Sequence, residues 1–399
     1  MTTTAPPAQA VETIDRDALV AQIRELGPVF TERAVKYDRE ASFPYENFED
    51  LRRIGFLALC VPQRYGGIGA SFADYARVSA EIGRYCGSTA LTFNMHNATM
   101  LWAGEVSDLL DMPDDVRAEH ERRRAELFRG VVEDGTIHSQ PFSEGISAGA
   151  TAGVATKAEI VDGGFSVTGR KIFASLAGAA HRYNITCQVP GEPFIRLLSV
   201  PADSPGVEIV GDWDPLGMRG TVSKTLLFND AFVPADHEVL PPRGYDQAAQ
   251  RFPFLFMSLA PSYLGLTRGI LDFVRAYLRG EVPGAAGGPP RRDLPQKQAG
   301  WAQLQIAYER SRSLLYDVLD NTRLDPDDEL LARAWAAVFT TMETANEVAA
   351  LAVRVCGGQS MLKHLPLERM YRDSRLGSTM LPWSAEVCLD RLGAARLYD

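Results

Sequence analysis

The chain has 399 residues, of which 46% are hydrophobic and 23% are charged, as in a soluble enzyme of two or three domains. Its net charge of −10 argues against a nucleic-acid or anionic-membrane partner, and no apolar run approaches the roughly 18 residues that cross a bilayer. The first residues lack a basic stretch followed by an apolar core. We therefore expect no secretory signal and a disordered tail over residues 1–12.

Cysteine and histidine usage indicates a reduced protein without a metal. The five cysteines are scattered and odd in number, the six histidines are isolated, and no CxxC pattern occurs. We expect buried thiols, a cytoplasmic location and no metal site.

Residues 13–135 are expected to form a helical domain. Residues 17–26 are amphipathic with a period of 3.6, and the charged stretch 114–130 closes the region. Three glycines, at positions 66, 67 and 69, form a turn between helices. No Gly-Lys-Ser or Gly-Lys-Thr follows them, so they do not predict a phosphate site.

The pattern then changes twice. Residues 136–242 contain short alternating segments, with a hairpin predicted around Asp162-Gly163-Gly164, and indicate a β-domain. From residue 250 to 399 the period is helical again, with apolar runs at 256–278, 298–320 and 329–356 and a loop at 279–296. The chain is therefore predicted to be an α+β multidomain protein.

The stretch Pro366–Asp390, together with the GGQSMLKHL that precedes it, resembles the C-terminal end of the acyl-CoA dehydrogenase family. The runs VPQRYGGIGAS and DPLGMRGTVSKTLLFNDAFVP extend the resemblance over nearly the whole chain. It implies an N-terminal helical domain, a middle β-barrel-like domain and a C-terminal four-helix bundle. It also implies FAD as cofactor, with FMN as the alternative for a monooxygenase, and a homodimer or homotetramer.

The same resemblance places several flavin contacts. The register of SEGISAGATAGV implies Phe142, Ser143, Ala148 and Gly149, and that of GRKIFASLAG implies Phe173, Ala174 and Ser175. Ser175 would stand for the threonine that bonds flavin N5, and a hydroxyl suits an atom that alternates between acceptor and donor. The alternative role for Ser175 is that of an ordinary turn residue. Because no GxGxxG follows a strand, a Rossmann site is not expected.

In this family a second subunit completes the flavin site. That role would fall to Arg354, Gly357 and Gly358, with Arg291 or Arg292 as a further pyrophosphate contact. An ion pair with a neighbouring carboxylate is the alternative for Arg354, and a solvated surface pair is the alternative for the other two arginines. Trp383 is expected beside the cofactor.

The family's catalytic glutamate is missing. Its position corresponds to Leu381, the alternative position on the next helical block corresponds to about Leu255, and no acid lies between Asp373 and Glu386. Glu386 could act as a displaced base, although a glutamate in a first helical turn is more often a dipole-stabilised residue. Taking an α-proton requires such a base.

Three functions therefore stay open. The first is a flavin-dependent oxidoreductase acting on an acyl thioester through a displaced base such as Glu386. The second is a flavin-dependent monooxygenase of the same fold, served by a flavin reductase or electron-transfer partner, in which His96 and Ser175 carry the site. His96 lies on an apolar stretch, where a lone histidine is usually a core residue. The third is a catalytically silent flavoprotein.

Overall fold

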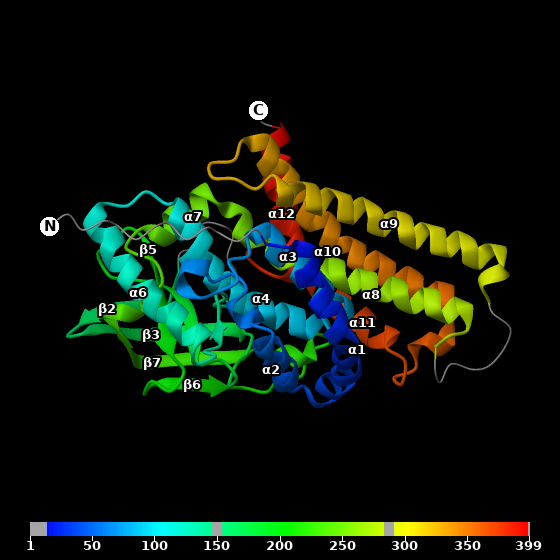
Figure 1. Cartoon of the computed structure of the whole chain (residues 1–399), viewed down its shortest axis with the longest axis horizontal. Helices are drawn as coiled ribbons and strands as arrows, with labels where there is room; N and C mark the ends of the chain where they lie inside the picture. Colours follow the sequence, from blue (N-terminus) through cyan, green and yellow to red (C-terminus); the bar gives the residue numbers. More distant parts are fainter. Residues whose placement is uncertain (1–13, 146–153, 283–290, 398–399) are drawn as a thin grey trace.

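The computed structural model describes residues 14–145, 154–282 and 291–397. Figure 1 shows the sheet at one end of the molecule and the long C-terminal helices at the other, with α3 and α4 between them. The first part of the chain is helical, as predicted. Its helices are α1 (Arg16–Glu40), α2 (Tyr45–Arg53), α3 (Phe72–Tyr85), α4 (Gly87–Leu101), α5 (Ser107–Leu109) and α6 (Asp114–Val132).

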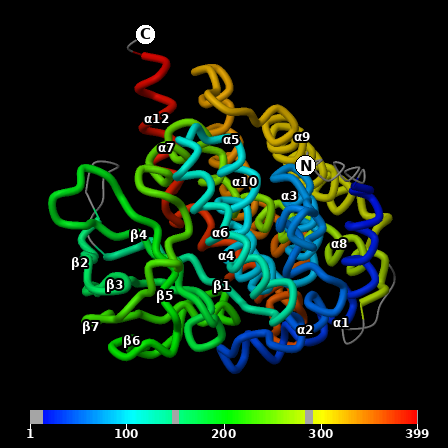
Figure 2. Tube along the Cα trace, turned by 60° about the vertical axis from the view of Figure 1, so that its left-hand side comes forward, coloured from blue at the N-terminus to red at the C-terminus, as the bar shows by residue number. Residues whose placement is uncertain are grey.

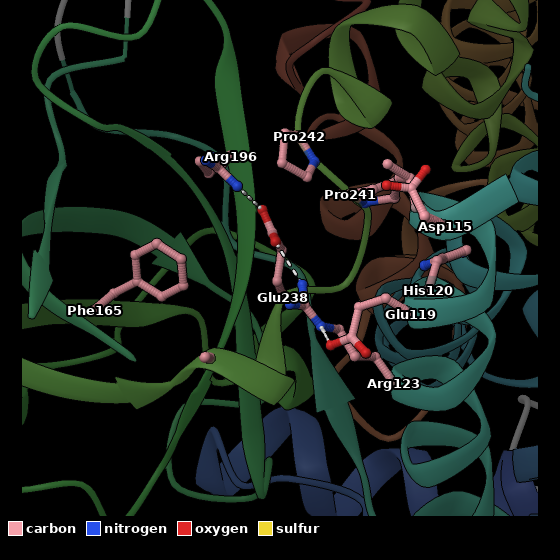
Figure 3. Close-up of a pocket in the computed structure, with 11 residues that line it drawn as sticks. Asp115, Glu119, His120, Arg123, Phe165, Arg196, Glu238, Pro241 and Pro242 are labelled. Carbon is pink, nitrogen blue, oxygen red and sulfur yellow. Dashed lines mark hydrogen bonds and ion pairs between the residues drawn. The ribbon is translucent and has the colours of Figure 1, made fainter. Parts of the chain in front are cut away.

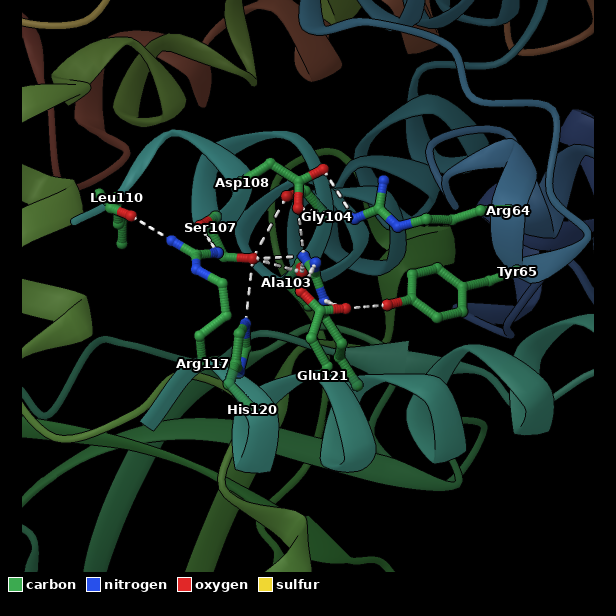
Figure 4. A network of polar contacts seen from close by, with 11 residues as sticks. Arg64, Tyr65, Ala103, Gly104, Ser107, Asp108, Leu110, Arg117, His120 and Glu121 are labelled. Carbon is green, nitrogen blue, oxygen red and sulfur yellow. Dashed lines mark hydrogen bonds and ion pairs between the residues drawn. The ribbon is translucent and has the colours of Figure 1, made fainter. Parts of the chain in front are cut away.

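Helix α4 carries no Asp, Glu, Lys or Arg and is almost completely buried, which suits a helix at the centre of the molecule. It continues into a π-helical turn, Trp102–Val106. A polar network below this turn ties it to α6, as Figure 4 shows. In that network the Ser107 hydroxyl lies 3.0 Å from the His120 ring, and the buried guanidinium of Arg124 pairs with Asp108 and Glu121.

The middle of the chain forms a curled seven-stranded sheet of order β1-β4-β2-β3-β7-β6, with β5 paired to β4. The predicted hairpin is confirmed: β2 and β3 pair antiparallel from Lys157 opposite Thr168 to Val161 opposite Gly164. Gly163, at φ 76°, provides the left-handed turn residue. The strands are β1 (His138–Ser139), β2 (Lys157–Val161), β3 (Gly164–Ala174), β4 (Arg182–Gln188), β5 (Ile195–Pro201), β6 (Val207–Val210) and β7 (Lys224–Pro234).

The C-terminal part returns to helices, and the three predicted long runs are confirmed as α8, α9 and α10, which pack side by side. Helix α11 packs on α8 and α10, and α12 lies along α10. Residues 381–383 separate α12 from the preceding turn, and the Ser384 hydroxyl accepts a bond from the backbone of Val387 at 3.4 Å. The helices are α7 (Gly244–Arg251), α8 (Ala260–Arg279), α9 (Pro295–Asp320), α10 (Asp328–Cys356), α11 (Leu367–Ser374) and α12 (Ala385–Leu397).

Helices α3 and α8 join the two helical parts at very close range, and Figure 2 shows them side by side. A Cβ added to Gly265 would lie 1.9 Å from the carbonyl oxygen of Ala80, and one added to Gly83 would lie 2.3 Å from that of Ser262. Only glycine permits this approach. In the described part of the chain one stretch, Pro253–Arg279, is long and apolar enough to cross a membrane, and 89% of its apolar window is buried inside the protein.

Candidate active site

A cavity of about 670 Å³ lies where the sheet meets the two helical parts. Its walls come from α4, the segment 140–145, the end of β3, residues 255–259 before α8 and the break 379–383 before α12. Cavities of this size enclose a drug-sized ligand or a cofactor ring. The cavity therefore collects most of the segments in which the sequence predicts site residues.

The end of β3 turns an aromatic side chain into this cavity. The pairing of β3 with β7 is irregular between Lys171 and Ala174, and Phe173 takes φ 52° at this irregularity. A non-glycine residue holds such a backbone conformation only when its surroundings enforce it. Phe173 lines the cavity and is 66% exposed, so its ring is available to a ligand, whereas Ala174 is buried in the strand.

Next to Phe173, three hydroxyl groups form a chain. The Ser175 hydroxyl lies 2.8 Å from that of Ser223, which lies 2.7 Å from that of Thr221. All three residues line the cavity and are buried. A hydroxyl can both donate and accept, so the chain can present either a proton or a lone pair to a ligand at Ser175.

The segment 142–145 is fixed by a buried ion pair. Lys171, which is fully buried, donates to Glu144 at 2.6 Å and to the carbonyl of Thr186 at 2.8 Å. Burial would raise the pKa of Glu144, but the bonds from Lys171 and Thr156 hold it below its usual value. Phe142 and Ser143 line the cavity on this anchored segment.

The break before α12 provides an apolar wall without a base. Leu381 and Leu255, at the two family positions for the glutamate, both line the cavity, and so does Trp383, which is 2% exposed. Among the described residues that line the cavity, Glu144 is the only carboxylate. Glu386 is exposed on α12 and is not part of the lining.

His96 lies in the core and does not line the cavity. Its Nε2 is 2.7 Å from the carbonyl oxygen of Leu57, and its Nδ1 accepts from the backbone of His138 at 3.1 Å. Burial lowers the pKa of the ring to about 4. The ring is therefore neutral and joins two backbone segments.

The residues expected to serve a second subunit lie away from the cavity. Arg354 is exposed near the end of α10, and Gly357 and Gly358 follow it with no atom within 4 Å of an added Cβ. Arg291 donates to the carbonyl of Cys356 at 3.0 Å, at the same end. This end of α10 is remote from the sheet in Figure 1. The positions Ala148 and Gly149 lie outside the described residues.

Two residues that line the cavity carry a buried donor nitrogen without a partner in the described protein. These donors are Nε2 of Gln140 and the indole Nε1 of Trp383. The sequence analysis did not predict Gln140, because only its missing partner distinguishes it. An isoalloxazine ring offers carbonyl oxygens and ring nitrogens that accept such bonds, and Phe173 offers it an apolar face. The Gln140 donor, the Phe173 ring and the cavity therefore fit a flavin.

A second cavity, of about 360 Å³, lies between α6 and β5. Figure 3 shows that charged side chains point into it and pair with one another. Glu238, which is 4% exposed, accepts from Arg196 at 2.6 Å and from Arg123 at 2.8 Å. These charges are satisfied internally, so this cavity presents ion pairs that hold α6 on the sheet.

The three-part α+β fold and the flavin-compatible cavity define a flavin-dependent oxidoreductase. The chain belongs to the acyl-CoA dehydrogenase family: the model of its N-terminal domain matches residues 15–104, and the model of its C-terminal domain matches residues 242–381. FAD, predicted from the resemblance, is the cofactor of this family.

Proteins similar to this chain carry names that describe different reactions. The putative acyl-CoA dehydrogenase YdbM of Bacillus subtilis is 26% identical over 364 residues, covering 89% of this chain and 91% of that protein. L-evernosamine nitrososynthase of Micromonospora sp. is 28% identical over 390 residues, covering 93% and 87%. The structure of FMN-bound TdsC from Paenibacillus sp. A11-2 superposes with a TM-score of 0.80 at 21% identity, covering 96% and 97%.

Proposed function

We propose that the chain is a flavin-dependent monooxygenase that transfers one oxygen atom from O₂ to a small organic molecule. The observation that carries the proposal is the absence of a free base: the only carboxylate among the described cavity residues is Glu144, and Lys171 and Thr156 already hold it. Without a base, the α-proton of an acyl thioester has no acceptor. The exposure of Glu386 does not favour a displaced base.

The bound flavin supplies two electrons and activates oxygen. One oxygen atom joins the substrate and the other leaves as water, so each turnover needs an external reductant such as NADH with a flavin reductase. FMN is a second candidate for the flavin. The 28% identical relative is named a nitrososynthase, which supports oxidation of a nitrogen or other soft atom as the reaction type.

In this proposal the residues around the cavity exclude water and supply a proton at the flavin. Leu381, Trp383 and Phe256 form an apolar wall, which excludes water from a reactive site. Ser175 can return a proton to the flavin edge, because its hydroxyl is linked through Ser223 to Thr221. The buried thiols, which are all free, support a cytoplasmic location.

A second copy of the chain completes the site in this proposal. Arg354, Gly357 and Gly358 lie together at the end of α10, away from their own cavity, as residues that serve a partner's flavin would. Sedimentation equilibrium tests this arrangement. A monomer at micromolar concentration that still binds flavin would contradict it.

The experiment that tests the function has two arms. In the first, the oxidised holoenzyme is mixed anaerobically with acyl-CoAs of increasing chain length, and we expect no loss of the visible flavin absorbance. In the second, flavin reductase, NADH and labelled O₂ are supplied with a panel of amines, indoles and thiophenes, and we expect label in one product. Bleaching by any acyl-CoA, or no labelled product from any compound, would overturn the proposal.

A further inference from the structure

Three side chains between α10 and α12 carry hydrogen-bond donors that have no acceptor in the described protein, and two of them, Trp383 and Arg391, line the cavity. These donors are the indole nitrogens of Trp335 and Trp383, both buried without a partner in the described protein, and the guanidinium of Arg391. The two indole rings lie 6.3 Å apart at 67°. The guanidinium carbon of Arg391 lies 5.9 Å and 6.0 Å from their centroids.

Arg391 differs from two other shielded arginines of this chain, Arg124 and Arg196. Arg124 and Arg196 are each paired with two carboxylates, as the networks around Glu121 and Glu238 in Figures 4 and 3 illustrate. Arg391 is half-buried and makes no ion pair in the described part of the chain, and burial lowers its pKa. The acids Glu386 and Asp390 of its own helix are exposed and do not pair with it.

An arginine stays protonated at neutral pH, so a shielded and unpaired guanidinium is unfavourable unless an anion reaches it. Buried polar groups are almost always bonded, and two orphaned indole donors beside one orphaned cation require acceptors only. An anionic oxygen group satisfies all three donors. Because Trp383 and Arg391 line the cavity, that group would enter with a ligand of the cavity.

We propose that Trp335, Trp383 and Arg391 form an anion subsite that selects substrates carrying a carboxylate or phosphate next to an apolar body. Calling the ligand a substrate rests on the proposed function, whereas binding of an anion at this subsite does not depend on turnover. The second source of the same chemistry is the phosphate of the flavin. Four flavin candidates, Phe142, Ser143, Phe173 and Ser175, lie away from α12, in the segment 142–145 and at the end of β3 or directly after it, which favours the substrate. Trp383, which was also expected beside the cofactor, belongs to the substrate subsite in this assignment.

The test compares an acid with its amide. Phenylbutyrate and phenylbutyramide have the same body and differ in charge, and their binding to the oxidised holoenzyme is followed by perturbation of the flavin spectrum. We expect the wild type to prefer the acid by about tenfold, the size of one charge-assisted hydrogen bond. The preference should fall below about twofold in Arg391→Gln and recover in part in Arg391→Lys. Arg275→Gln, which removes an exposed arginine of α8, should leave it unchanged.

The remaining outcomes of these measurements test the subsite, the source of the anion and the proposed function separately. Equal affinity for acid and amide in the wild type, or no binding of the acid, overturns the subsite. A second arm titrates FMN and riboflavin into the flavin-free full chain. If Arg391→Gln weakens FMN alone, the anion is the flavin phosphate and the substrate assignment is wrong. Because these are binding measurements, a failure to oxygenate any compound would overturn the proposed function without touching the subsite.

Discussion

Replacing Lys171 with methionine should destabilise the protein strongly. Its ammonium makes a charge-assisted bond to Glu144 at 2.6 Å and two bonds to Thr186, at 2.8 Å to the carbonyl and 3.2 Å to the hydroxyl. One bond to a charged group and two weaker ones amount to about 4 kcal/mol, of which methionine recovers about 1 kcal/mol by filling the space. We therefore expect a loss of about 3 kcal/mol in the free energy of unfolding, measured in urea at neutral pH.

Two further variants separate the ion pair from a general packing effect. Lys171→Met leaves the Glu144 carboxylate without its main partner, and adding Glu144→Gln removes that charge. The loss of unfolding free energy in the double variant should therefore be smaller than the sum of the two single losses by about 1–2 kcal/mol. Lys157→Met, at an exposed lysine of the neighbouring strand β2, should change stability by less than about 0.5 kcal/mol.

The pair also anchors the segment that carries Ser143, so Lys171→Met should weaken flavin binding about tenfold under conditions where the variant is folded. A loss of stability below about 1 kcal/mol, or strictly additive effects of the two substitutions, would refute the assignment of the pair as the anchor of the segment.

Three other variants probe other parts of the molecule. Burial raises the pKa of Glu105 to about 7, so the carboxyl costs stability as the pH rises from its unfolded pKa through 7. Glu105→Gln should therefore gain up to about 3 kcal/mol near pH 8 and less than about 1 kcal/mol near pH 5, and equal gains in urea melts at both pH values would contradict this. Ser175→Ala should keep the fold but release more hydrogen peroxide per NADH, and unchanged coupling would exclude the hydroxyl chain. Gly265→Ala should lose about 2 kcal/mol or more from its backbone clash, whereas Gly393→Ala, with open space around its Cβ, should gain about 0.5 kcal/mol in the same melts.

Local patterns were sufficient to predict the elements of this fold. The runs that became α8, α9 and α10 carry the helical period, and the hairpin around Gly163 carries its own turn residues. These features depend on residues near one another in the chain, which is why the sequence reveals them.

The cavity was harder to predict, because its chemistry depends on what each side chain meets in space. His96 resembles a pocket residue in the sequence, yet its ring nitrogens bond the backbones of Leu57 and His138, which come from distant segments. Gln140 and Arg391 were missed for the opposite reason. Each is distinguished by a partner that the described protein lacks, and no local pattern marks that absence.

The contact between Gly83 on α3 and the start of α8 has a consequence for how this protein can be divided. The chain completes one helical part, builds the entire sheet and then returns, so the sheet is an insertion within a continuous helical body. A hybrid that exchanges only the N-terminal or only the C-terminal helices would have to match backbone to backbone at Ala80 and Gly265, where there is no side chain to adjust. Exchange of the sheet avoids this junction, which makes it the part that recombination can replace most easily.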